Sequence, residues 1–207
     1  MNVSLERILS ALNLDSYSSS EGWLGYSERT CRFQEAICQH AIDLFTSAFG
    51  NGACRLCVLS SLFIEARAYR GVRASLDCLI SHPCDTWCGD SGILKLIDYD
   101  QLHVQMPVEG QYFQYVDSLH QNISLYPDVE IALCQQALRA VMAVDGVKGH
   151  FFVVLPEWRL IVYPHDDTGY GFITFEDASS AELVPFLRKH FAIAPFRFVL
   201  SKKYAAE

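Results

Sequence analysis

Apolar residues recur along the chain with two different periods, and the clearest stretch is residues 148–175, KGHFFVVLPEWRLIVYPHDDTGYGFITF. Phe151–Leu155 is a continuous apolar run, Trp158–Tyr163 alternates apolar and polar residues, and Gly171–Phe175 is apolar again. The polar segment 164–169 separates the last two runs. Runs of β-branched and aromatic residues bounded by Pro, Asp and Gly are typical of antiparallel strands joined by turns. The stretch therefore predicts three successive strands.

Elsewhere, apolar residues at a spacing of three and four predict amphipathic helices. Glycines follow two of these segments, at Gly50 and Gly146, and glycine commonly ends a helix. A proline, Pro185, falls inside the last segment and should kink that helix or reset its start. The predicted helices are Leu5–Leu14, Glu35–Phe49, Val72–Ile80, Pro127–Val144 and Ser179–His190.

Five further segments read as strands or remain open. Ala53–Phe63 is apolar enough for a buried strand. Ile93–Met106 and Tyr112–Asn122 predict two strands on either side of a turn at Pro107–Gly110, although the apolar residues of the second also fit a helical period. Gly22–Phe33 is compatible with a short strand or with irregular structure. Phe196–Leu200 alternates apolar and polar residues, which predicts a final strand.

A long-range regularity links the two halves of the chain. Residues 37–60 and 133–156 align without gaps, with six identical positions that include Cys38/Cys134 and Gly50/Gly146. Both windows read as a helix, a glycine and an apolar strand, through duplication or through chance among similar patterns. We predict an α+β fold: a mixed or antiparallel sheet with helices packed on it, in one domain over 1–207 with possible pseudo-repeated halves 1–106 and 107–207.

The composition limits the classes of protein that the chain can represent. Of its 207 residues 51% are hydrophobic, which suffices for a sizeable core and excludes global disorder. No stretch approaches the roughly 18 uninterrupted apolar residues of a membrane helix. The first residues carry Glu6 and Arg7 inside their apolar pattern, so a signal peptide is not expected. We therefore expect a soluble, cytoplasmic protein that does not bind a membrane.

The balance of acidic and basic residues limits the kind of macromolecule that the protein would bind. Twenty-four acidic residues against sixteen basic ones give a net charge of −8. Sequence-independent binding of nucleic acid relies on Lys and Arg that neutralise phosphates, so the balance argues against a nucleic-acid partner. An acidic surface is compatible with a basic protein partner, which it would steer toward the site, and also with a simple gain in solubility.

The turn His165-Asp166-Asp167-Thr168-Gly169 holds the most suggestive polar cluster. Two carboxylates and an imidazole could ligate a divalent cation or act as general acid and base. The same residues are also typical of an ordinary turn, because Asp caps backbone amides and Gly accepts a positive φ. Exposed charges at the tip of a rigid hairpin could equally contact a partner without catalysis.

The eight cysteines lie mostly in apolar surroundings, where a reduced Cys behaves as a small hydrophobe. His82, Cys84 and Cys88 have a spacing that zinc ligands can adopt, but a structural site needs four ligands, and a loop with incidental thiols is the alternative. Cys54 and Cys57 have the spacing of a redox pair but lie inside an apolar run, so we expect them to pack in the core. We predict no cofactor.

The C-terminal pattern FFVV-x(5)-LIVYPHDDTG resembles a small bacterial family of domains of unknown function. Members of that family carry an aliphatic–Tyr–x–Asp–Asp–x–Gly turn, which this chain departs from through Pro164-His165. The resemblance covers about the last 80 residues, and it implies an architecture and a bacterial, cytoplasmic setting but no catalytic residue. The matching positions are Ile161, Tyr163, Asp166, Asp167 and Gly169.

Three functions remain after these exclusions. The first is a non-catalytic binding protein, most readily an immunity-type protein that neutralises a basic toxin through an acidic surface. The second is a small metal-dependent hydrolase that uses His165, Asp166 and Asp167, and the third is a regulatory module that responds to metal or redox state through Cys84 and Cys88. The partner-binding residues of the first are predicted to be Glu157, His165, Asp166, Asp167, Glu176 and Asp177.

Overall fold

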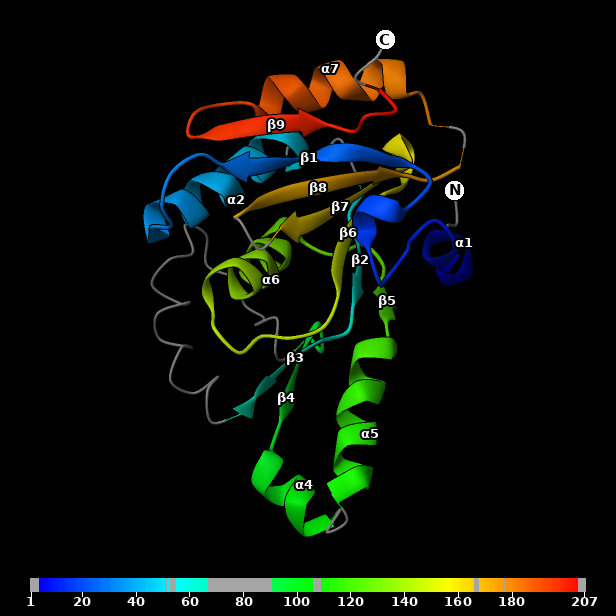
Figure 1. Ribbon diagram of the computed structural model, residues 1–207, viewed down its shortest axis with the longest axis vertical. Helices are drawn as coiled ribbons and strands as arrows, with labels where there is room; N and C mark the ends of the chain where they lie inside the picture. Colours follow the sequence, from blue (N-terminus) through cyan, green and yellow to red (C-terminus); the bar gives the residue numbers. More distant parts are fainter. Residues whose placement is uncertain are drawn as a thin grey trace. The chain divides into compact units, whose positions relative to one another are not determined.

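A computed structural model describes residues 4–50, 52, 55–66, 91–105, 109–165, 168–176 and 178–204. Within these residues the fold is α+β, as predicted, with helices, a seven-stranded antiparallel sheet and a two-stranded parallel sheet (Figure 1). The chain divides into two compact units, Met1–Cys57 with Phe152–Glu207 and Val58–Phe151, which are described separately. No helix among the described residues is long and apolar enough to cross a bilayer.

The first unit contains five strands of the large sheet, in the order β6-β7-β8-β1-β9. The predicted run of three strands is confirmed as β6, β7 and β8, and the final strand as β9. The open segment 22–33 resolves as strand β1, which pairs with both β8 and β9. The bounds are β1 Trp23–Arg29, β6 Phe151–Leu155, β7 Leu160–His165, β8 Gly169–Thr174 and β9 Phe196–Leu200.

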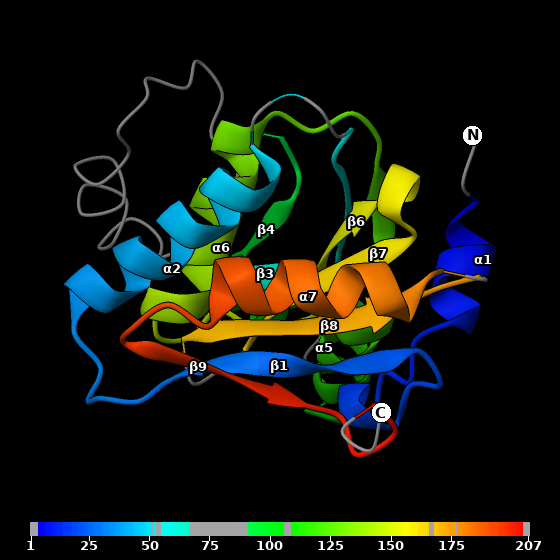
Figure 2. The same ribbon diagram turned by 90° about the horizontal axis from the view of Figure 1, so that it is seen from above.

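Two helices pack on one face of this sheet, α2 Glu35–Phe49 and α7 Ser180–Phe191. Tyr170 and Phe172, alternate residues of β8, point to this face: the Tyr170 hydroxyl donates to the Ala41 carbonyl at 3.1 Å, and the Phe172 ring lies 4.9 Å from the Phe191 ring. Figure 2 shows α7 running along β8. Burial of one such aromatic side chain contributes about 2 kcal/mol, so the sheet and the helices stabilise each other.

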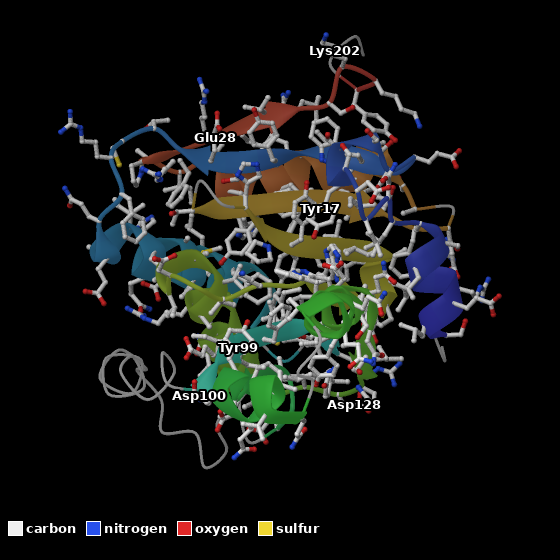
Figure 3. All side chains as sticks on the ribbon, turned by 60° about the horizontal axis from the view of Figure 1, so that its bottom comes forward. Tyr17, Glu28, Tyr99, Asp100, Asp128 and Lys202 are labelled. Carbon is white, nitrogen blue, oxygen red and sulfur yellow. The ribbon has the colours of Figure 1, made fainter. Side chains whose placement is uncertain are left out.

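The predicted helix Glu35–Phe49 is confirmed at both ends. The predicted helix Ser179–His190 is confirmed as α7, which continues through Pro185, so this exposed proline does not reset the start of the helix. On the opposite face of the sheet lies the short 3-10 helix η1, Tyr17–Ser19. Its Tyr17 ring packs on the Tyr163 ring at 4.7 Å, in front of the strands in Figure 3.

The first unit also contains helix α1, Leu5–Ser10, and the 3-10 helix η2, Pro156–Trp158. The helix α1 is shorter than the predicted Leu5–Leu14, because the chain leaves the helix at Ala11 and then folds around Asn13. The Asn13 carboxamide oxygen accepts hydrogen bonds from the backbone amides of Asp15 and Ser16, each at 3.1 Å. These local bonds compete with the helical ladder and end the helix early.

The second unit holds two strand pairs. β2 pairs antiparallel with β5, and β3 pairs parallel with β4. The predicted strand 53–63 is therefore two strands that separate at Ser61, whose backbone amide donates to the His150 carbonyl at 2.9 Å. Gly149 faces this point with φ +102°, and a Cβ there would lie 2.3 Å from the Ser61 carbonyl oxygen. The bounds are β2 Cys57–Ser60, β3 Leu62–Glu65, β4 Leu94–Ile97 and β5 Ser124–Tyr126.

The strand prediction for Ile93–Met106 is wrong beyond β4, and that for Tyr112–Asn122 is wrong throughout. Helices α4 Tyr99–Gln105 and α5 Glu109–Gln121 occupy these segments. Asp98 begins α4, since its carboxylate accepts the Gln101 backbone amide at 3.1 Å. The helical period noted as the alternative for α5 is the one that the fold uses. Its Tyr115, Val116 and Leu119 pack in a cluster with Phe63, Ile97 and Leu102.

The helix α6 Ile131–Ala143 confirms the helix predicted over Pro127–Val144, with a later start. Its Cys134 is buried, as is Cys38 in α2, and each helix is followed by a strand. A duplication of the two windows stays a prediction. The predicted helix Val72–Ile80 and the residues Pro107 and Val108 of the predicted turn lie outside the described residues, as does Cys54. Cys57 is buried in β2, as expected for core packing.

Candidate functional site

The β7–β8 hairpin divides the predicted partner-binding residues between its two ends. Leu160 pairs with Thr174 at one end and His165 with Gly169 at the other. Glu157 precedes the first pair and Glu176 follows it, whereas His165 lies at the turn. Six extended residues span roughly 20 Å, so the two glutamates are too far from His165 to share a metal ion or a catalytic step with it.

The imidazole of His165 is half-buried and stacks on a neighbouring tyrosine. Its ring centroid lies 5.4 Å from that of Tyr26, with an angle of 11° between the planes, and Tyr26 in turn stacks on Trp23 at 6.1 Å. Across the described ranges, no group of three or more His, Cys, Asp or Glu is placed to hold a metal ion. The predicted residues outside these ranges are His82, Cys84, Cys88, Asp166, Asp167 and Asp177.

The two described glutamates of the predicted acidic surface each contact arginine. The Glu157 carboxylate lies 3.8 Å from Arg55 Nε, and the Glu176 carboxylate lies 3.1 Å from Arg7 Nη2 and 3.7 Å from Arg159 Nε. The Glu176 side chain is 22% exposed and that of Glu157 45% exposed. This end of the hairpin is therefore a network of mixed charge and not a bare acidic surface.

Two residues of this network have an unusual backbone. Arg159 has φ +50° and Glu176 has φ +56°, the left-handed region that non-glycine residues rarely adopt. The backbone amide of Phe175 donates to the Arg159 carbonyl at 3.0 Å, which holds the two segments side by side. Each left-handed residue costs roughly 1–2 kcal/mol, and such strain collects at functional sites.

A cavity of about 770 Å³, hereafter the aromatic pocket, opens beside this network. Trp158 and Phe186 meet edge to face in its wall, with ring centroids 4.3 Å apart, and both are half-buried. Phe49 supports them from the core, 5.9 Å from Trp158 and 5.8 Å from Phe186. The lining residues are Pro156, Glu157, Trp158, Arg159, Ala178, Ser179, Glu182, Leu183 and Phe186.

Three charged side chains line the aromatic pocket. Arg159 contacts Glu176, and Glu157 contacts Arg55. Glu182 is exposed in the first turn of α7, and no ion pair is recorded for it among the residues that the structure describes. Its negative charge is therefore the one most available to a cation in the pocket.

His190 packs against Phe186 of the aromatic wall, and its surroundings disfavour the charged imidazole. Its ring lies 4.4 Å from that of Phe186. Burial lowers the pKa of His190 below 6.5, and the neighbouring Lys189 lowers it further. The lowered pKa favours the neutral form of the imidazole beside the pocket.

A second cavity of about 600 Å³, hereafter the polar pocket, adjoins the first. Ala178 lines both cavities, and the ion pair between Arg159 of the aromatic pocket and Glu176 of the polar pocket joins their walls. The polar pocket is lined by Ser10, Ala11, Leu12, Asn13, Ser19, Ser20, Glu21, Gly22, Thr174, Phe175, Glu176, Ala178, Lys203 and Tyr204.

The sequence pointed to Glu157 and Glu176 but not to the pockets beside them. Trp158 and Phe186 lie 28 positions apart in the chain and read there as core residues of a strand and a helix. The only local signal was an aromatic residue directly after Pro156-Glu157, at a break between two strands. Comparisons with protein-family models, with curated proteins and with solved structures find no match to this chain.

Proposed function

We propose that this protein is a non-catalytic binding protein that recognises a basic protein partner, as an immunity protein recognises the toxin that it neutralises. The observation that carries the proposal is the aromatic pocket with the carboxylates of Glu157 and Glu182 at its rim. A basic side chain of the partner would enter this pocket.

Arginine and lysine side chains match the chemistry of the pocket. Their aliphatic stems would pack on the half-buried rings of Trp158 and Phe186, and a cation near an aromatic face gains about 0.5–2 kcal/mol. The charged end would meet Glu182, and it would also compete with Arg55 for Glu157. At 3.8 Å between two exposed side chains, the Arg55–Glu157 pair is weak enough to exchange.

The charge of the whole chain supports the same class of partner. A net charge of −8 attracts a basic protein over a distance and raises the rate of encounter. Trp, Tyr and Arg are also the residues that most often dominate binding energy at protein interfaces. A partly exposed tryptophan in a concave site with charges around it fits this pattern.

Capture of the partner from the source organism tests the proposal. Wild type, Trp158→Ala, Glu182→Arg and Asp145→Arg are immobilised and exposed to the same lysate, and the bound proteins are identified by mass spectrometry. Asp145→Arg is the matched control, because it makes the same charge change at an exposed acid of the other compact unit.

We expect wild type and Asp145→Arg to retain a basic protein that Trp158→Ala and Glu182→Arg lose. A partner retained equally by all four proteins would contradict the pocket as its binding site. The absence of any specifically retained protein, together with an adjacent gene that encodes no toxin, would remove the immunity-type function.

A further inference from the structure

Resting on the proposed function, we infer that the partner presents an extended peptide segment, with its basic side chain in the aromatic pocket and the adjacent residues in the polar pocket. The two cavities adjoin, since Ala178 lines both of them. A single side chain, or a small cation, would occupy only the first.

The geometry of an extended chain suits two adjoining cavities. Successive residues of such a chain advance about 3.3 Å, so residues two apart would reach neighbouring cavities from one side of the peptide. The side chain at the junction, Ala178, is the smallest that carries a Cβ, and it leaves room for a peptide backbone to cross. The Arg159–Glu176 ion pair marks the same boundary.

The charges that line the two pockets favour a basic segment over an acidic one. The residues that line the two pockets include four carboxylates, of Glu21, Glu157, Glu176 and Glu182, but two cations, of Arg159 and Lys203. Arg7 and Arg55 reach two of these carboxylates from outside the lining. Glu21 and Glu182 are exposed, one at each pocket, and both would attract positive charge on the peptide.

The polar pocket is preorganised for hydrogen bonding. The Asn13 backbone amide donates to Ser20 Oγ at 2.9 Å, and Ser19 Oγ donates to Ser16 Oγ at 3.1 Å. These bonds cross-link the segment between α1 and β1, which forms a wall of the polar pocket. A rigid polar wall reduces the entropy lost on binding, so it suits the amide groups of a peptide backbone.

Two ligands distinguish a peptide from an isolated side chain: N-acetyl-arginine amide and the pentapeptide N-acetyl-Ser-Gly-Arg-Gly-Ser-amide. Each is titrated into ¹⁵N-labelled full-length protein, and shifts are followed for the Trp158 indole and for the backbone amides of Ser19, Glu21 and Glu182. The variant Ser10→Leu places an apolar side chain in the polar pocket without a change of charge.

We expect both ligands to shift the Trp158 indole, and only the pentapeptide to shift Ser19 and Glu21. One or two added hydrogen bonds should make the pentapeptide bind about ten-fold more tightly. Ser10→Leu should remove that gain and leave the affinity for the amide unchanged, with thermal unfolding confirming that the variant is folded.

Equal affinities for the two ligands, without shifts at Ser19 and Glu21, would overturn the extended segment and leave the proposed function standing. A gain that persists in Ser10→Leu would also overturn the use of the polar pocket. If neither ligand shifts the Trp158 indole, the proposed function itself fails.

Discussion

Arg159 and Glu176 face each other at the end of the β7–β8 hairpin, both with left-handed backbone, and their side chains pair at 3.7 Å. Glycine would adopt this backbone conformation without strain at either position, yet each position carries a long charged side chain. The side chains are therefore retained at a cost in backbone energy.

This cost can be measured at Arg159. Arg159→Ala and Arg159→Gly both remove the ion pair, but only glycine relieves the left-handed strain. We expect Arg159→Gly to have a free energy of unfolding about 1 kcal/mol higher than Arg159→Ala in urea denaturation. Equal stability of the two variants would show that the backbone is not strained here.

Gly171 provides a test of the packing between β7 and β8. Its position lies against the Tyr163 ring, and a Cβ there would be 1.9 Å from Tyr163 Cζ. Tyr163 is 5% exposed and cannot swing away, so we expect Gly171→Ala to lower the free energy of unfolding by about 2–3 kcal/mol.

The control for this substitution is Gly110→Ala in α5. Nothing lies within 4 Å of a Cβ at Gly110, and alanine is the better helix former. This variant should be unchanged or more stable by up to about 1 kcal/mol. A destabilised Gly110→Ala, or a neutral Gly171→Ala, would contradict the described packing.

The ionisation of Tyr17 should make the stability of the fold depend on pH in the alkaline range. Burial, together with the neighbouring Tyr163, raises the pKa of Tyr17 to about 12. Since an acid with a raised folded-state pKa stabilises the fold in its neutral form, this contribution is complete below pH 10 and is lost as the pH rises toward 12. Ultraviolet titration should show one tyrosine that ionises near 12, absent in Tyr17→Phe; an unchanged titration curve in the variant would contradict this.

The protonation of His190 should make the stability of the fold fall as the pH is lowered, the opposite direction to the effect of Tyr17. Its pKa is lowered by burial and then by Lys189, so the folded state binds the proton less well than the unfolded state. The contribution of the neutral imidazole is present above pH 6.5 and is lost as the pH falls through the lowered pKa. NMR titration of the ring should give a pKa below 6.5 that rises in Phe186→Ala, which exposes the ring. A pKa at or above 6.5 in the wild type would be incompatible with this burial.

Local sequence patterns predicted the secondary structure correctly where the spacing of the apolar residues fitted only one period. The helix Glu35–Phe49 and the three strands between Phe151 and Phe175 are correct because their apolar residues fit one period and their ends carry Gly, Pro or Asp. The segment Tyr112–Asn122 fitted two periods. Only its packing against Phe63 and Ile97, distant in sequence, decides for the helix.

The candidate site was less accessible to sequence reasoning than the fold. The acidic residues at 157 and 176 were visible, but their partners Arg7, Arg55 and Arg159 come from three separate segments. An ion pair between such positions leaves no local signature. For the same reason, the aromatic pocket could not be assembled from a tryptophan in one segment and a phenylalanine in another.

The affinity of the aromatic pocket for a positively charged side chain tests the central claim most directly. N-acetyl-arginine amide and its neutral isostere N-acetyl-citrulline amide are each titrated against the Trp158 indole resonance, assigned by comparison with Trp158→Phe. The account predicts saturable shifts with the arginine compound and at least about five-fold weaker binding of the citrulline compound, with the difference abolished in Glu182→Gln. Equal binding of the two compounds, or no shift with either, would contradict it.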